Sequence, residues 1–245
     1  MTDRQDNNEL VFLPLGGVGE IGMNLALYGY GPANNREWII VDCGVTFPGP
    51  DLPGVDLVLP DIRFIEAERK NLVGIVLTHA HEDHFGALID LWPRLKVPVY
   101  ATPFSASLLE AKCASERDAP KIAVNVVPVG GRITLGDFDV EFVPVAHSIP
   151  EAHALAIRTP AGTVLHTGDW KIDPTPVVGL PTDEAFELAE NNLLALGGCC
   201  IDLDGPERSC TSCGHEWRIK RRYDGSLILP PLPSWPDEDE PDAGA

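Results

Sequence analysis

The sequence contains no long apolar run, which excludes one large class of protein. Across its 245 residues, apolar stretches fall far short of the ~18 consecutive residues that a membrane-spanning helix needs. The first nine residues are polar and of mixed charge, unlike a secretory signal peptide. No internal repeat recurs along the chain. We therefore expect a globular, cytoplasmic protein with no membrane partner.

Basic residues are also scarce. Lys and Arg number 18 against 37 Asp and Glu, which gives a formal net charge of -19. This balance argues against capture of nucleic acid by the surface as a whole. It does not exclude a nucleic-acid substrate, because a bound metal ion would supply positive charge that a count of side chains misses.

Three of the seven histidines lie within one short segment. His79, His81 and His84, with Asp83, directly follow the apolar run 74–77, which predicts a buried strand. Imidazole and carboxylate groups are the usual ligands of borderline divalent metals such as zinc. A structural polar loop has no need of this ligand density, so the pattern indicates a metal site.

The spacing divides these residues between two ions. His79 and His81 are two apart, so in an extended segment both imidazoles point to the same side. Asp83 and His84 begin the next predicted helix and can turn toward a second ion. His147 and Asp169 each come just after another predicted strand, and a carboxylate at 169 could bridge the two ions.

Residues 10–190 share one pattern, in which short β-rich runs alternate with turn residues. Strands are predicted at 10–13, 23–28, 38–41, 74–77, 97–100, 124–129, 140–145, 154–158 and 163–166. Helices are predicted at 85–92, 103–115 and 183–196. Many hairpin-like strands with a few helices favour two sheets packed face to face and covered by helices.

The motif His-x-His-x-Asp-His at 79–84 resembles the signature of the metallo-β-lactamase superfamily. His147 and the Gly168-Asp169 turn match the next two motifs of the superfamily, and Asp42 matches its early aspartate. The segments 15–24, 78–87, 147–151 and 166–176 are similar to the ribonuclease J family, and the likeness covers roughly residues 10–190.

This resemblance implies an αββα sandwich (mixed α/β) and a two-zinc hydrolase that cleaves RNA phosphodiesters, as endonuclease and 5′-to-3′ exonuclease, with a metal-activated hydroxide. It implies that one Zn²⁺ is held by His79, His81 and His147. Asp83 and His84 would hold the other, and Asp169 would bridge them. It gives Asp42 the role of orienting ligating histidines. Asp83, His84 and Asp169 are the catalytic candidates.

Two other functions stay open. One is hydrolysis of a small ester, thioester or lactam on the same scaffold, and the other is a catalytically inactive metal- or RNA-binding remnant. The resemblance also implies an inserted β-CASP domain and a later histidine ligand, but the only histidine after Asp169 is His215. We therefore expect an incomplete sandwich, with exposed strand edges that favour a homo-oligomer or a protein partner.

The composition changes near residue 191. Residues 191–229 contain a zinc-ribbon-like knuckle, Cys210-x-x-Cys213-Gly, with Cys199, Cys200 and His215 as further candidate ligands of one structural zinc. Free thiols are the alternative. Residues 230–245 hold five prolines and five carboxylates and are predicted to be a disordered tail.

One motif points to a different cofactor. Gly17, Gly19 and Gly22 follow a predicted strand and fit the dinucleotide fingerprint, with Asp42 placed 20 residues beyond. That fingerprint must open a helix. Residues 23–37 contain glycines, a proline and paired asparagines, which predict strand, turn and strand instead.

Overall fold

The computed structural model describes residues 8–171, 173, 176–178 and 182, together with the strand residues 208–209 and 216–217. The chain divides into two units, Met1–Gly197 and Gly198–Ala245. Within the described residues, no helix is both long enough and apolar enough to cross a bilayer.

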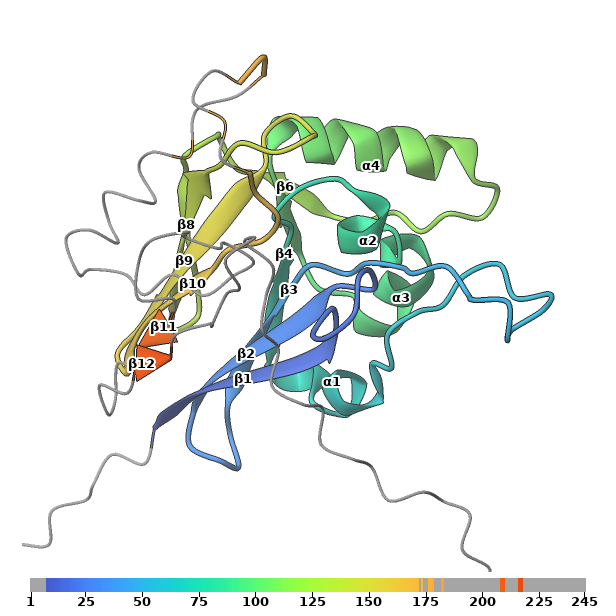
Figure 1. The fold of residues 1–245 in the computed structure, drawn as a ribbon. Helices are drawn as coiled ribbons and strands as arrows, with labels where there is room; N and C mark the ends of the chain where they lie inside the picture. The colour runs from blue at the N-terminus through green and yellow to red at the C-terminus, as the bar shows by residue number, and fades with distance from the viewer. Residues whose placement is uncertain are drawn as a thin grey trace, which may run out of the picture. The chain divides into compact units, whose positions relative to one another are not determined.

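A six-stranded sheet forms the centre of the first unit (Figure 1). Its strands are β1 Glu9–Gly16, β2 Leu25–Gly31, β3 Glu37–Val41, β4 Leu72–Val76, β5 Val99–Ala101 and β6 Val124–Val126, in that spatial order. The first three strands pair antiparallel, and β3 through β6 pair parallel. Parallel neighbours need crossover connections. These contain α1 Arg63–Ala67 and a 3-10 turn Arg69–Asn71, then α2 Glu82–Phe85 and α3 Leu88–Leu95, then α4 Pro103–Ser115.

A second, four-stranded sheet is entirely antiparallel. It consists of β7 Arg132–Leu135, β8 Phe138–Pro144, β9 His153–Thr159 and β10 Gly162–His166, in the order β10-β9-β8-β7. Short turns join β7 to β8 and β9 to β10, as hairpin geometry allows. The longer β8–β9 connection carries His147.

Strand alternation explains how the layers pack. In β3, Trp38 and Ile40 join a cluster with Leu88 and Leu91 of α3, whereas Ile39 and Val41 pack against residues of the second sheet. The middle of the central sheet is therefore buried on both faces, and its strands β2, β3 and β4 are nearly continuous apolar runs. Helices cover one face and the second sheet covers the other (Figure 1).

The structure confirms the predicted class of mixed α/β sheets. It also corrects details: the helix predicted at 85–92 is two helices, α2 and α3, and both α1 and β7 were missed. The outer face of the second sheet carries a small cluster that includes Val143 and Ala154, and no residue of a described helix belongs to that cluster. The helix predicted at 183–196 lies outside the described residues.

The sequence predicted that the glycine-rich segment opens a strand and not a helix. The structure agrees, because residues 16–22 lead into strand β2. The dinucleotide fingerprint is therefore a coincidence of spacing. In the second unit, β11 Arg208–Ser209 pairs antiparallel with β12 Glu216–Trp217. The candidate knuckle ligands Cys199, Cys200, Cys210, Cys213 and His215, like the predicted tail 230–245, lie outside the described residues.

Candidate metal centre

Three loops at the carboxyl ends of strands lead to the candidate ligands, and a fourth carries Asp42. Asp42 follows β3, and His79 and His81 follow the neighbouring parallel strand β4. In the second sheet, His147 follows β8 and Asp169 follows β10. The Asp169 loop turns at Gly168, which has a φ of +55°, and an added Cβ there would lie 3.1 Å from the carbonyl oxygen of residue 153.

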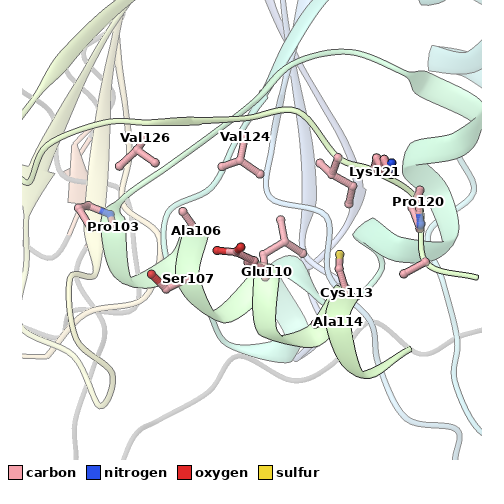
Figure 2. Close-up of a pocket in the computed structure, with 13 residues that line it drawn as sticks. Pro103, Ala106, Ser107, Glu110, Cys113, Ala114, Pro120, Lys121, Val124 and Val126 are labelled. Carbon is pink, nitrogen blue, oxygen red and sulfur yellow. The ribbon is translucent and has the colours of Figure 1, made fainter. Parts of the chain in front are cut away.

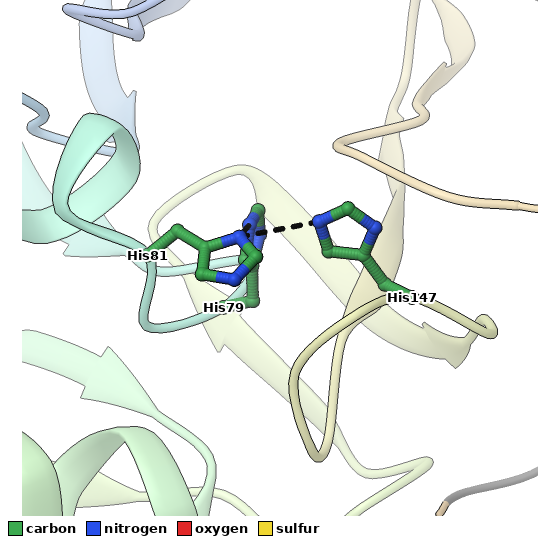
Figure 3. A group of neighbouring side chains, drawn as sticks. All are labelled: His79, His81 and His147. Atoms are coloured by element: carbon green, nitrogen blue, oxygen red, sulfur yellow. Dashed lines mark hydrogen bonds between the residues drawn. The ribbon is translucent and has the colours of Figure 1, made fainter. Parts of the chain in front are cut away.

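Three imidazoles converge on one point. The Nε2 atom of His79 lies 3.1 Å from Nδ1 of His81, and the same Nδ1 lies 3.2 Å from Nε2 of His147 (Figure 3). Tetrahedral Zn–N bonds of about 2.05 Å would place neighbouring nitrogens roughly 3.3 Å apart. The observed spacing therefore fits a shared metal ion.

A second group adjoins the first. One ligand atom each from His79, His84 and Asp169 lies within 4.8 Å of the others. The Asp169 Oδ1 atom lies 3.5 Å from Nε2 of His84, and its Oδ2 atom lies 3.7 Å from Nε2 of His147. The two carboxylate oxygens thus face different groups, which is the placement a bridging ligand needs. Asp83 belongs to neither group, but its Oδ2 atom lies 3.6 Å from Nε2 of His84.

Asp42 lies beneath both groups and is only 1% exposed. Its carboxylate accepts hydrogen bonds from the Thr78 N–H, the Thr78 hydroxyl and Nδ1 of His84, each at 2.8 Å. Because the Thr78 hydroxyl gives its only hydrogen to Asp42, its 2.9 Å contact with Nδ1 of His79 requires that nitrogen to donate. His79 and His84 therefore both direct Nε2 toward the candidate metal positions.

The charges favour a bound cation. Burial alone would lower the pKa of His84, but the charge of Asp42 and hydrogen bonds to Asp169 and Asp42 raise it to about 10. The hydrogen bond from His84 holds the pKa of Asp169 at about 2. His79 differs, because burial and the neighbouring imidazoles lower its pKa to about 3, which keeps its lone pair available. The donor set and its charge therefore fit metal ions.

Sequence reasoning gave no role to three residues that hold the site in place. The Asn24 amide donates to the Asp83 carbonyl at 3.0 Å and contacts Nε2 of His84 at 3.1 Å. Thr78 links His79 to Asp42, as described above. Lys112 of α4 forms an ion pair with Glu82 at 2.5 Å and lies 5.2 Å from the centre of the Phe85 ring. Asn24 closes the glycine-rich motif, and this position was its only sequence clue.

One groove lies away from these side chains. It encloses about 640 Å³ between α4 and residues 119–126, and its lining includes Ala106, Glu110 and Val124 (Figure 2). None of the candidate metal ligands lines this groove. The convergence of histidine and carboxylate side chains, and not the size of a cavity, therefore identifies the candidate site.

Comparison with known proteins agrees with this geometry. The family model described as the Metallo-beta-lactamase superfamily matches residues 30–215, so the chain belongs to that superfamily. It is 62% identical over 196 residues to Ribonuclease J of Sinorhizobium meliloti, covering 79% of this chain and 35% of that protein. It is 47% identical over 178 residues to Ribonuclease J of Corynebacterium glutamicum, covering 72% of this chain and 24% of that protein.

A solved structure supports the fold alone. A protein of unknown function from Enterococcus faecalis aligns with a TM-score of 0.51 at 21% identity, over 82% of this chain and 52% of that one. The chain spans about a third or less of the length of the two ribonuclease J relatives named above.

Proposed function

We propose that this chain is a two-zinc hydrolase domain of the ribonuclease J type, which cleaves RNA phosphodiester bonds. One observation carries the proposal: two adjacent donor groups share His79, and the two oxygens of Asp169 face different groups. The identity to proteins named Ribonuclease J supports RNA as the substrate. The cytoplasm as the location remains a prediction from the sequence.

Each side chain has a defined role in this proposal. His79, His81 and His147 would hold one ion, Asp83 and His84 would hold the other, and Asp169 would bridge them. Asp42 accepts hydrogen bonds on the far side of the site and fixes which nitrogen of His84 faces the metal. When bound, a zinc pair polarises a phosphoryl oxygen and provides a nucleophile at neutral pH.

The protein contributes a buried and rigid frame around these groups. Because His79 and His84 are almost fully buried, water competes little for their metal-facing nitrogens. The mixture of neutral imidazoles and carboxylates leaves a zinc pair with residual positive charge, which suits an anionic phosphodiester. A broadly basic surface is then unnecessary for the substrate to bind near the metals.

Four further assignments remain predictions. The catalytic domain is proposed to cover residues 10–190, with a knuckle at 191–229 that would hold another zinc and a tail at 230–245. A homo-oligomer or protein partner along the sheet edges is proposed because, among the described residues, β1 and β6 end the central sheet and β7 and β10 end the second sheet.

Metal content measured together with RNA cleavage tests the proposal. Wild-type protein, loaded with Zn²⁺ and freed of excess metal, should hold two ions in the domain and shorten a 5′-monophosphorylated RNA. His81→Ala should lose at least one ion and the activity, whereas Glu110→Ala should match wild type because Glu110 lines the remote groove. Cleavage of small esters or lactams without cleavage of RNA would refute the assigned substrate. Metal binding without any hydrolysis would refute the assignment as an enzyme.

A further inference from the structure

Helix α4 receives its N-terminal cap from a distant loop. Its own N-cap residue, Thr102, makes no capping bond, and Pro103 at the first helical position has no N–H. The first free N–H, that of Phe104, donates instead to Oε2 of Glu151 at 2.8 Å, across 47 residues of sequence. A carboxylate there both satisfies an unpaired donor and complements the helix dipole.

Glu151 lies in the same loop as His147. This loop connects β8 to β9 and is closed at its base by a hydrogen bond from the Val145 N–H to the Ala152 carbonyl, 3.0 Å long. The loop is also held by Ile149, which packs against two apolar clusters, and by Ala146, whose N–H donates to the Thr182 hydroxyl at 3.0 Å and whose carbonyl accepts from the Lys171 N–H at 2.8 Å. Within the described part of the chain, the Glu151 carboxylate supplies the hydrogen bond that joins this loop to helix α4.

The backbone at Glu151 is held in an unfavourable conformation. Its φ is +56°, in the left-handed region that non-glycine residues seldom occupy. The buried His153 donates from Nδ1 to the Glu151 carbonyl at 2.7 Å, and its Nε2 atom accepts from the Gly130 N–H at 3.5 Å. This geometry directs the side chain of residue 151 toward α4. A glycine would adopt the same backbone angle more easily but could not cap the helix.

The bond joins the two parts of the metal centre. Helix α4 follows β5 of the central sheet. His79 and His81 follow β4 of the same sheet, whereas His147 follows a strand of the second sheet. We propose that Glu151 is a positioning residue that sets the distance of His147 from His79 and His81 by anchoring its loop to the N-terminus of α4. This inference rests on the proposed metal site and extends it to a residue outside the ligand set.

Substitutions at position 151 separate positioning from general stability. In Glu151→Ala the affinity of the three-histidine site for Zn²⁺ should fall about tenfold, the lower end of the effect of losing a group that orients a ligand. Glu151→Gln keeps an acceptor oxygen and should stay within about threefold of wild type. Zn²⁺ titration against a competing chelator measures the affinities, and thermal melting of the metal-free proteins measures stability.

Two control variants complete the design. Glu110→Ala removes a carboxylate from α4 on the side that faces the groove (Figure 2), and it should leave Zn²⁺ affinity unchanged. Leu109→Val weakens the packing of the buried face of α4 and keeps the Glu151 side chain. It should lower the melting temperature of the metal-free protein but not Zn²⁺ affinity.

The outcomes are distinct. Wild-type affinity in Glu151→Ala would overturn the inference, as would losses in Glu151→Ala and Leu109→Val that simply follow their melting temperatures. Loss in Glu151→Ala with rescue in Glu151→Gln supports it. If the wild-type protein binds no Zn²⁺, the proposed function fails. If it binds Zn²⁺ and cleaves RNA while Glu151→Ala behaves identically, only the positioning role fails.

Discussion

Replacing Asp42 with asparagine should weaken metal binding at both donor groups without changing the shape of the site. The Asp42 carboxylate accepts three hydrogen bonds of 2.8 Å, from the Thr78 N–H, the Thr78 hydroxyl and His84 Nδ1. An asparagine oxygen can keep the bond to the Thr78 N–H. Its NH₂ group would then meet two hydrogens, one on the Thr78 hydroxyl and one on His84.

To remove that clash, His84 and His79 must each move the ring hydrogen from Nδ1 to Nε2. His84 must accept at Nδ1 and carry its hydrogen on Nε2, which faces the second group. The Thr78 hydroxyl must accept from the asparagine and donate to Nδ1 of His79, which moves the His79 hydrogen to Nε2 as well. A metal can bind only after each ring changes tautomer at the cost of its hydrogen bond.

The size of the effect follows from the number of ligands involved. Loss of one hydrogen-bond partner behind a metal ligand typically costs about 10- to 100-fold in affinity. Two ligands in two groups are affected, so Asp42→Asn should weaken Zn²⁺ binding at both by at least about tenfold. Zn²⁺ titration with chelator competition measures this, with Glu110→Ala as the control. Two ions bound to Asp42→Asn at wild-type affinity would refute the hydrogen-bond reasoning.

Other substitutions and pH test further parts of the site. Asp169→Asn, which keeps the shape but removes the charge, should weaken the binding of both ions by about tenfold or more, as measured by metal analysis after dialysis. Loss of one ion with the other unaffected would contradict bridging. In metal-free protein, the raised His84 pKa of about 10 predicts stability that is fully present below about pH 6.5 and is lost as pH rises toward 10. Urea unfolding in EDTA should show this decline, at most about 1.4 kcal/mol per unit of pKa shift, and His84→Gln should abolish it. A decline that persists in His84→Gln would point to other groups. Asn24→Ala, which removes the hydrogen bond to the Asp83 carbonyl, should lower the affinity of the His84 group for Zn²⁺ about tenfold while leaving the three-histidine group near wild type, as read from two-step titrations. Equal loss at both groups would contradict that local role.

The sequence predicted the elements whose causes are local. The helix predicted at 103–115 has the same bounds as α4, because a proline at its first position and the helix-forming residues after it are sufficient. Strands with continuous apolar runs, such as β3 and β4, were also found within a few residues. The composition of these segments is sufficient to predict their structure.

Elements with tertiary causes were missed or misjudged. The predicted helix at 85–92 is interrupted near Gly86, where an added Cβ would lie 2.4 Å from the Glu82 carbonyl oxygen and 2.9 Å from the Val45 side chain. The Ala87 N–H then bonds to the Cys43 carbonyl, outside the helix. Strand β7 was missed because its alternation of polar and apolar residues is only four residues long, Arg132–Leu135, and pairing with β8 stabilises it.

The candidate site divides in the same way. His79, His81 and His84 could be picked out because they are close in sequence and of one chemical type, although their role as ligands stays a prediction. The supporting contacts could not, because Asn24 reaches Asp83 across 59 residues and Glu151 reaches Phe104 across 47. Only the fold brings such partners together.

Anomalous X-ray scattering at the zinc edge, from crystals of the Zn²⁺-loaded protein, tests the metal centre most directly. Two peaks should appear in this domain, one among His79, His81 and His147 and the other beside His84 and Asp169. Peaks located only away from these side chains, or none at all, would contradict the proposed two-metal centre.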